Sequence, residues 1–308
     1  MHCVASRARE NKHEQKDSDQ KTPSVVGFDY AFVDDVGENA VERGSCGILL
    51  IGVDGNTGTS FACQCSKKGR KDLYACAAVC QFIKGLGLKK VIIQSDGEPS
   101  ICDLVKYAVA RLAAEGYEIT HRTSPAYDPQ SNGLVESQVG QVKRMVKVLT
   151  SVINSNYEMK IGPRHYLYGW AVRHASWLMN RYVPRGVLKK SAYYATRGAG
   201  YRGQLVPFGE TVMAHWTTRA NQKAWVRSTF VGKHETDDTN LVATDLGIIS
   251  CRTIRRLTDE QCWEKQVLIA GGGSPWKMAT DAHGRGLANQ RPQPHTIPIA
   301  VSADIGTV

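Results

Sequence analysis

Residues 25–33 read VVGFDYAFV, a short run in which β-branched, aromatic and other apolar side chains dominate. Such a run predicts a β-strand that is buried in the centre of a sheet. Asp29 stands in the middle of this run. An ionised carboxylate inside a buried strand costs several kcal/mol unless it is paired or binds a metal. The stretch therefore predicts a central strand and, within it, one residue of a functional site.

The segments that follow this strand alternate between β-rich and helical patterns. Residues 47–53 (GILLIGV) and 59–65 (TSFACQC) are β-rich, and the DGNTG between them predicts a hairpin. Apolar spacing and Gly-containing stops then predict a helix over 72–84, a strand over 89–94, a helix over 100–114, a strand over 117–121 and a helix over 134–154. This order indicates an α/β domain with a mixed sheet and flanking helices.

The second half of the chain has a different pattern. A helix is expected over 164–182, and short β-rich runs between 210 and 257 alternate with turn residues, which suggests a small β-barrel. Composition divides the chain into a disordered N-terminal segment (1–23), the α/β domain (24–160), a helix and linker (161–207), a small β-rich C-terminal module (208–262) and a mostly disordered tail (263–308).

The net charge of +10 is distributed very unevenly. Residues 1–23 carry 5 basic and 4 acidic groups, 24–136 carry 11 and 14, 137–233 carry 16 and 2, and 234–308 carry 7 and 9. The net charges are therefore +1, −3, +14 and −2. One alternative for the basic segment is a solvated helical surface. The strength of the bias, with Tyr, Trp and His interleaved, favours a nucleic-acid-binding face.

Two further features of the composition exclude classes of protein. The longest apolar stretch, residues 47–53, is far below the roughly 18 residues that a membrane span needs, and the N-terminus lacks a hydrophobic signal core, so a spanning or secreted protein is not expected. Nine cysteines contain no Cys-x-x-Cys pair, which predicts reduced, buried thiols rather than a disulfide framework or a closed zinc site.

Three carboxylates stand at related places in the expected topology. Asp29 lies in the first strand, Asp96 follows the strand over 89–94, and Glu136 lies in the first turn of the long helix. Taken singly, Asp96 is a common turn residue and Glu136 suits a helix N-terminus. Together they form an oxygen-ligand set for two Mg²⁺ or Mn²⁺, which at about 3.5–4 Å separation can promote phosphodiester chemistry.

The sequence around these acids resembles a known family. Residues 123–137 (TSPAYDPQSNGLVES) resemble the loop and helix start that carry the catalytic Glu of retroviral and copia-type retrotransposon integrases. Residues 91–98 (VIIQSDGE) and 26–30 (VGFDY) are similar to the strands that carry the family's two Asp residues. The resemblance extends over about 24–257, because 169–181, 207–214 and 225–256 also look like the post-core region of copia-type Pol polyproteins.

The resemblance implies a ribonuclease-H-like fold and an enzyme that performs DNA 3′-end processing and strand transfer with two Mg²⁺ or Mn²⁺ ions. It further implies that Asp29, Asp96 and Glu136 are both the catalytic residues and the metal ligands. Element ends and target DNA would be the partners, with the protein a homo-oligomer on DNA. Such an enzyme would be assembled in the cytoplasm and act in the nucleus.

The chain departs from the family pattern at several points. Between Asp96 and Glu136 lie 39 residues, which is about four more than is common in the family, or roughly one helical turn. An additional turn in the helix over 100–114 would absorb this difference. Gly140 replaces a residue that is usually polar or basic, and the family's N-terminal zinc module is absent from this sequence.

The long helix has two faces that bear on DNA binding. Glu136, Lys143 and Lys147 follow the helical period on one face, so we expect Lys143, Arg144 and Lys147 to contact a DNA backbone, although a solvated face is the alternative. The neighbouring apolar stripe, expected to pack on the sheet, comprises Val135, Val139, Val142, Val146, Leu149 and Ile153.

The loop before this helix carries Gln130, Ser131 and Asn132. These residues either cap the helix and form its turn or contact the DNA end, and we favour DNA contact. Two rival functions stay open at this point. The first is a catalytically inactive or domesticated integrase-derived DNA-binding protein, and the second is a related metal-dependent nuclease.

Overall fold

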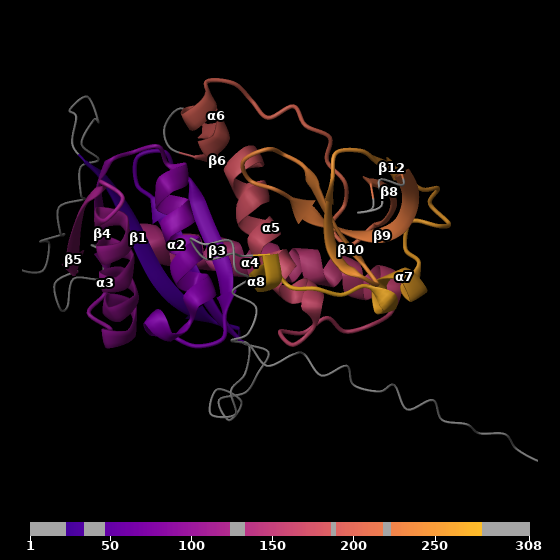
Figure 1. The fold of residues 1–308 in the computed structure, drawn as a ribbon, viewed down its shortest axis with the longest axis horizontal. Coiled ribbons are helices and arrows are strands. Elements are labelled where there is room, and N and C mark those ends of the chain that lie inside the picture. Colours follow the sequence, from indigo (N-terminus) through magenta and orange to yellow (C-terminus); the bar gives the residue numbers. More distant parts are fainter. Residues whose placement is uncertain (1–22, 34–46, 124–132, 186–188, 218–222, 279–308) are drawn as a thin grey trace, which may run out of the picture.

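The protein is described by a computed structural model that covers residues 23–33, 47–123, 133–185, 189–217 and 223–278. Its first sheet has the strand order β3-β2-β1-β4-β5, with the strand that carries Asp29 at the centre (Figure 1). β1 pairs antiparallel with β2 and parallel with β4, so the expected mixed sheet is confirmed. The strands are β1 (Ser24–Phe32), β2 (Ile48–Asp54), β3 (Ser60–Cys65), β4 (Lys90–Ser95) and β5 (Glu118–Thr123).

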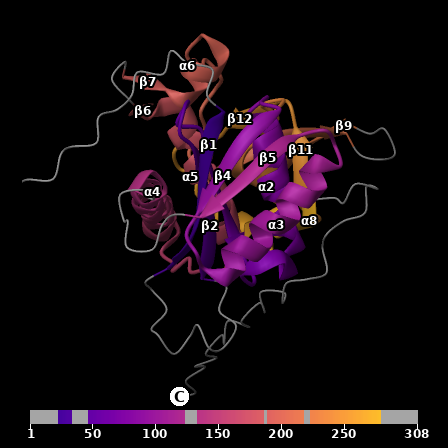
Figure 2. The same ribbon diagram turned by 90° about the vertical axis from the view of Figure 1, so that its left-hand side faces the viewer.

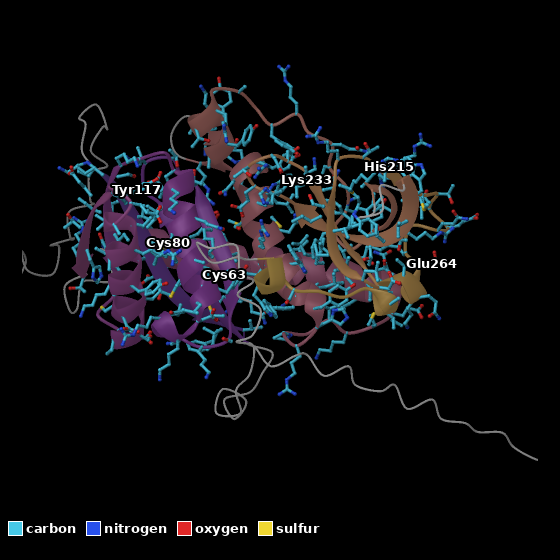
Figure 3. The ribbon with its side chains drawn as sticks, in the orientation of Figure 1. Cys63, Cys80, Tyr117, His215, Lys233 and Glu264 are labelled. Atoms are coloured by element: carbon cyan, nitrogen blue, oxygen red, sulfur yellow. The ribbon has the colours of Figure 1, made fainter. Side chains whose placement is uncertain are left out.

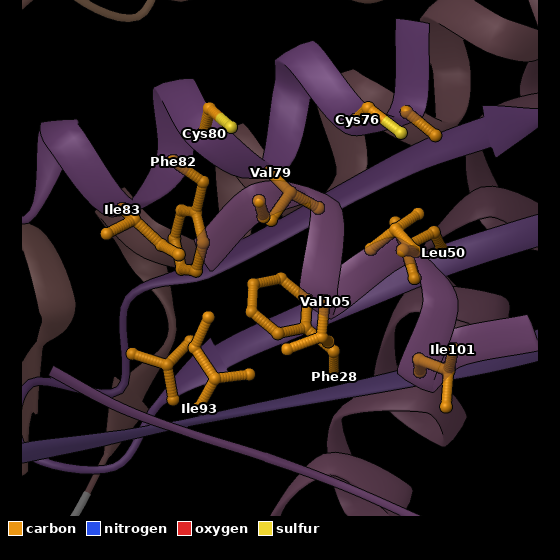
Figure 4. Close-up of a cluster of buried hydrophobic side chains, with 14 of the residues drawn as sticks. Phe28, Leu50, Cys76, Val79, Cys80, Phe82, Ile83, Ile93, Ile101 and Val105 are labelled. Atoms are coloured by element: carbon orange, nitrogen blue, oxygen red, sulfur yellow. The ribbon is translucent and has the colours of Figure 1, made fainter. Parts of the chain in front are cut away.

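Helices cover both faces of this sheet (Figure 2). A short 3₁₀ turn, η2 (Gly69–Lys71), precedes α2 (Leu73–Gly85), and α2 and α3 (Pro99–Ala113) enclose one buried core with β1 and β4. Phe28 lies at the centre of this core, between Val105 and Ile93 on one side and the α2 side chains on the other (Figure 4). The other face is covered by α4 (Gly133–Tyr157) and α5 (Tyr166–Tyr182).

The second sheet is antiparallel and has the strand order β11-β10-β9-β8-β12. Its strands are β8 (Thr211–Thr217), β9 (Lys223–Lys233), β10 (Asn240–Thr244), β11 (Gly247–Cys251) and β12 (Ile254–Arg256). The β-rich module is therefore present within the expected range. β11 and β12 stand at the two edges of the order in the described part of the chain, so closure into a barrel stays a prediction.

Short elements connect and follow the two sheets. β6 (Pro184–Arg185), β7 (Lys190–Ser191) and α6 (Ala192–Arg197) lie between α5 and the second sheet, and α7 (Lys265–Ala270) and α8 (Pro275–Met278) lie after it. The expectation of a mostly disordered tail over 263–308 is wrong for residues 263–278. Leu268 and Trp276 are buried there, and the Trp276 ring meets Tyr74 of α2 at a centroid distance of 6.3 Å. Residues 279–308 lie outside the described residues, as do 1–22.

α4 and α5 form a layer that both sheets share (Figure 1). The end of α4 and one face of α5 build a core with the second sheet, in which Ile153 and Trp170 pack with Val231 and Leu241. The Tyr157 hydroxyl donates a hydrogen bond of 2.8 Å to the carbonyl of Gly209 just before β8. The two halves of the molecule are therefore packed on common helices.

The described cysteines agree with the expected thiol state. All seven are free, and burial raises the pKa of the Cys76 thiol to about 12 and that of Cys80 to about 11. Cys3 and Cys46 lie outside the described residues. Among the described helices, none is both long enough and apolar enough to cross a bilayer.

The edge strand β3 is fixed to α5 by one side chain. The Asn180 Oδ1 atom accepts hydrogen bonds from the Ser60 amide (2.7 Å) and hydroxyl (2.9 Å), and its Nδ2 atom donates to the Ser60 carbonyl (2.7 Å). Because Ser60 is buried, water cannot replace these bonds.

We therefore expect Asn180→Ala to lower the free energy of unfolding by about 1–3 kcal/mol, since it leaves buried backbone groups without partners. Urea unfolding followed by circular dichroism measures the change. Asn156→Ala is the matched control, because Asn156 is an exposed asparagine on α4 that bonds only to the Val152 carbonyl. Equal losses in the two variants would contradict the role given to Asn180.

Candidate active site

The register of the first sheet brings Asp29 beside Asp96. β1 and β4 are parallel, and Phe28 lies opposite Ser95, so the next residue on each chain is an aspartate. Neighbouring strands lie about 4.8 Å apart, which puts the two carboxylates within direct electrostatic reach. Both side chains are half-buried. Asp29 alternates with the core residues Phe28 and Tyr30 and therefore faces the side of the sheet that α4 covers.

The start of α4 brings Glu136 to the same place. A Cβ atom on Gly27 would lie 3.3 Å from the Cβ of Val135, so the missing side chain lets α4 approach β1 closely. Val135 is buried in this contact, and the next residue, Glu136, is exposed. The helix therefore fixes Glu136 at the solvent side of Asp29.

The pKa of Asp29 is raised by its burial and by the carboxylates near it. Burial and the neighbouring Asp96 carboxylate raise the pKa of Asp29 to about 6, and Glu136 and Glu98 add smaller contributions in the same direction. A backbone hydrogen bond at Tyr30 acts in the opposite direction. Repulsion between carboxylates raises a pKa because it disfavours the charged form. Asp96 and Glu136, which the sequence analysis grouped with Asp29, are therefore within electrostatic range of it and disfavour its charged form.

The donor set fits a hard divalent cation. Carboxylate oxygens are the ligands that Mg²⁺ and Mn²⁺ prefer, and a cation would relieve the repulsion that the pKa of Asp29 reveals. Among the described residues, however, no group of three or more His, Cys, Asp or Glu side chains lies close enough to hold a metal ion as it stands. The carboxylates therefore fit a divalent cation by their chemistry as oxygen ligands and by the repulsion that a cation would relieve.

The turn that carries Asp96 is held by several hydrogen bonds. The Ser95 hydroxyl donates to the Asp96 carbonyl at 3.0 Å and lies 3.0 Å from Nε2 of His121 on β5. The Glu98 amide donates to Oδ1 of Asp96 at 3.2 Å. Burial, together with Lys106, lowers the pKa of His121, so this histidine is a neutral packing group near neutral pH. The turn thereby fixes the Asp96 carboxylate beside β1.

The second histidine of interest, His174 on α5, lies far from this turn in the fold. It is fully buried between the rings of Trp177 and Phe208, and burial lowers its pKa to about 3. His174 is therefore a packed, uncharged side chain of the core near neutral pH.

A fourth carboxylate, Glu98, was missed by the sequence analysis. Lys68 Nζ lies 2.6 Å from Glu98 Oε1, and the Ser100 hydroxyl donates to the same oxygen. Burial acts to raise the pKa of Glu98, but the bonds from Lys68 and Ser100 outweigh it and hold the pKa below its ordinary value. The Lys68 ammonium also lies 4.8 Å from the centre of the half-exposed Phe32 ring. Lys68 is 30 residues from Glu98, so no local spacing could have revealed the pair.

The remaining residues predicted from the sequence lie on α4 or in the segment that precedes it. On α4, Lys143 is half-buried and Arg144 and Lys147 are exposed. The expected apolar stripe packs as predicted, with Val135, Val142, Val146 and Ile153 buried and Val139 and Leu149 partly buried. Gln130, Ser131 and Asn132 lie outside the described residues.

Comparisons with known proteins give distant structural similarities. No family model matches the chain, and no curated protein matches it. A chain of the simian T-cell lymphotropic virus intasome in complex with the PP2A regulatory subunit B56 gamma is 16% identical, covering 76% of this chain and 78% of that chain, with a TM-score of 0.42. The catalytic core domain of BIV integrase is 17% identical, covering 56% of this chain and 92% of that chain, with a TM-score of 0.38.

The catalytic core domain of HTLV-2 integrase in complex with magnesium is 15% identical, covering 56% of this chain and 95% of that chain, with a TM-score of 0.38. At these values the similarity concerns the fold alone and assigns no activity to this chain.

The pKa of Asp29 provides a test of the carboxylate cluster. We expect Asp96→Asn to lower the Asp29 pKa from about 6 toward its ordinary value, and Glu136→Gln to lower it by less, because Asp96 makes the larger contribution. Carbon-13 NMR titration of the Asp29 carboxyl in metal-free protein measures both shifts. Glu118→Gln is the control, since Glu118 is an exposed glutamate that pairs with Lys90 at the start of β5. A larger shift in Glu136→Gln than in Asp96→Asn would contradict the geometry.

Proposed function

We propose that the chain is an integrase-type polynucleotidyl transferase from a copia-type retrotransposon Pol polyprotein, which processes DNA 3′ ends and transfers them to target DNA. The observation that carries the proposal is the meeting of Asp29, Asp96 and Glu136 from β1, the turn after β4 and the start of α4, close enough for Asp96 and Glu136 to raise the pKa of Asp29. The mixed sheet in which Asp29 is central agrees with the ribonuclease-H-like core that the sequence resembles.

In this proposal Asp29, Asp96 and Glu136 hold two Mg²⁺ or Mn²⁺ ions, whose chemistry is to activate an oxygen nucleophile and stabilise the leaving oxygen of a phosphodiester. The protein contributes the position and the charge of the ligands. The Ser95, His121 and Glu98 bonds orient the turn of Asp96, and the ion pair with Lys68 offsets the charge of Glu98. Half-burial of Asp29 limits access of water to the centre of the site.

The proposal assigns the DNA to the basic middle of the chain. Residues 137–233 carry a net charge of +14, and this segment contains most of α4 and all of α5, β8 and β9. Lys143, Arg144 and Lys147 continue along α4 from Glu136, so a phosphate backbone that reached the carboxylates would pass them. Gln130, Ser131 and Asn132, which directly precede α4, would contact the DNA end. A homo-oligomer on DNA and action in the nucleus belong to the same proposal.

Two other functions agree with the same fold. A domesticated DNA-binding derivative would keep the basic segment without productive metal binding, and the presence of all three acids argues against it. A metal-dependent nuclease would hydrolyse DNA without joining it, and the additional β-rich module argues against that function. Strand joining separates the three possibilities.

We expect the full chain to join oligonucleotide 3′ ends to a target duplex in the presence of Mg²⁺, and Asp96→Asn to abolish joining, because one ligand of the set loses its charge. Gel analysis of labelled strands distinguishes joined products from hydrolysed ones. Asp245→Asn, in the exposed turn between β10 and β11, is the control and should keep full activity. Hydrolysis without joining would favour the nuclease, and equal activity in wild type and Asp96→Asn would refute the catalytic assignment.

The basic face of α4 has its own test. Replacing Lys147 with Gln should weaken binding to all duplex sequences alike and reduce the slope of log K against log salt by about 1, since one phosphate contact is lost. Fluorescence anisotropy at several salt concentrations measures the slope. Lys265→Gln on α7 is the matched control and should leave the slope unchanged. An unchanged slope in Lys147→Gln would place the DNA elsewhere.

A further inference from the structure

The edge strand β5 carries an arginine on the side of the first sheet that faces α4. Side chains alternate along the strand, so Ile119 lies against the core that α2 and α3 cover, and Arg122 points to the opposite side. α4 stands on that side of the sheet and α3 on the other (Figure 2). Tyr117, which directly precedes β5, lies at the opposite end of the molecule from His215 of the second sheet (Figure 3). Arg122 is therefore exposed at the outer edge of the first sheet, far from the second one.

The strand register places Arg122 in a row that leads to the carboxylates. Arg122 lies opposite Gln94 of β4, and Gln94 lies opposite Gly27 of β1. Gly27 faces α4, so the whole row is on the α4 side of the sheet. Asp29 stands two residues beyond Gly27, about 7 Å along the strand, and Asp96 stands two residues beyond Gln94. Arg122 therefore shares one face of the sheet with the two aspartates and lies one short step away from them.

Gln94 fixes the orientation of the Arg122 side chain. The Gln94 Oε1 atom accepts hydrogen bonds from Nε (2.9 Å) and Nη2 (2.6 Å) of Arg122. Gln94 is only 7% exposed, so it is held by its surroundings. One oxygen that binds both N–H groups on an edge of the guanidinium holds this planar group in place, and the remaining N–H groups point elsewhere. An exposed arginine that would otherwise sample many rotamers is thereby ordered before any ligand binds.

The positive charge of Arg122 stays available because Gln94 is neutral. Within the described residues no carboxylate forms an ion pair with Arg122, whereas Arg70 in the same half of the molecule pairs with Asp103. The planar guanidinium binds two oxygens of a phosphate side by side, which the ammonium group of lysine does not do. A phosphate that approaches the carboxylates is repelled by them, and a guanidinium on the same face offsets this repulsion.

We propose that Arg122 binds a phosphate of the DNA strand that enters the carboxylate site, and that Gln94 is the positioning residue for its guanidinium. This inference rests on the proposed function, because it names a group that holds the substrate at that site. The bound phosphate is a neighbour of the reacting phosphodiester, since Asp29 and Asp96 lie about 7 Å further along the face. Arg122 contributes charge and hydrogen-bond donors and takes no part in proton transfer, because arginine stays protonated.

Joining kinetics of the full chain with Mg²⁺ and a blunt duplex oligonucleotide test the role of Arg122. Arg122→Gln should lower kcat/KM by about 10- to 100-fold, the loss expected for one hydrogen-bonded contact to a charged group, and most of it should appear as a higher KM. Arg122→Lys should recover only part of this loss, because lysine keeps the charge without the planar fork. Arg111→Gln is the matched control, since it removes an arginine from α3 on the other side of the sheet, and it should react as wild type does.

A double-mutant cycle tests the role of Gln94. Gln94→Leu should also raise KM, by less than Arg122→Gln does. It should add nothing when it is combined with Arg122→Gln, because Gln94 acts only through the arginine. Additive losses in the double variant, or full activity of Arg122→Lys, would contradict the positioning role. Circular dichroism and thermal unfolding verify that each variant is folded.

A second measurement does not depend on joining. Phenylglyoxal modifies accessible arginines, and mass spectrometry of proteolytic peptides measures the extent of modification at each site. The duplex should protect Arg122 in wild type and in Asp96→Asn, and it should leave the reactivity of Arg111 unchanged. Protection of Arg122 without joining would support this inference while the proposed function fails. Equal modification of Arg122 with and without the duplex would refute the inference, as would joining with the same KM in wild type and Arg122→Gln.

Discussion

The free energy of keeping the Asp29 carboxylate inside a β-sheet governs the arrangement around it. Burial and three neighbouring acids raise its pKa to about 6, so the site in isolation is electrostatically unfavourable. Proteins tolerate such a charge when it serves binding or catalysis. The negative charge of the fourth carboxylate near Asp29, Glu98, is offset because Lys68 and Ser100 bind it. The close approach of α4 at Gly27 then determines where Glu136 meets the pair of aspartates.

The layer formed by α4 and α5 connects this site to the second sheet. Arg181, near the end of α5, lies over Trp177 at 4.0 Å and over Tyr201 at 5.2 Å, and its burial lowers the guanidinium pKa. The Tyr201 hydroxyl donates to Asp238, which also pairs with Lys233 of β9 at 2.9 Å. Tyr201, in the middle of the segment between α5 and the second sheet, thereby contacts both of them. These contacts add to the core that α4 and α5 share with the second sheet.

Acidic and basic residues are separated along the chain. Residues 24–136, which include the first sheet, carry a net charge of −3, and the basic excess of +14 lies in residues 137–233. Many of the basic groups are already paired, as Arg173 is with Glu235 and Arg256 with Glu210. The formal net positive charge therefore overstates the charge that is available to a ligand. The exposed basic residues of α4 and β12 are more informative than the net charge.

Local signals were sufficient for the order of helices and strands and for the central place of residues 25–33, because apolar period and turn residues act over a few residues. They also made the three acids candidates for a site, because a charge inside an apolar run is visible locally. Local signals were insufficient wherever the residues that contact each other are far apart in the chain. The register that sets Asp29 beside Asp96, the Lys68–Glu98 pair and the contact of Arg255 with Trp225 each join residues about 30 or more positions apart. The packing of Trp276 against Tyr74 is of the same kind, and it corrected the expected start of the tail. The sequence by itself determined which residues are candidates for the chemistry, and the tertiary structure decided which of them lie near one another, because burial and pairing between distant segments leave no periodic trace in the chain.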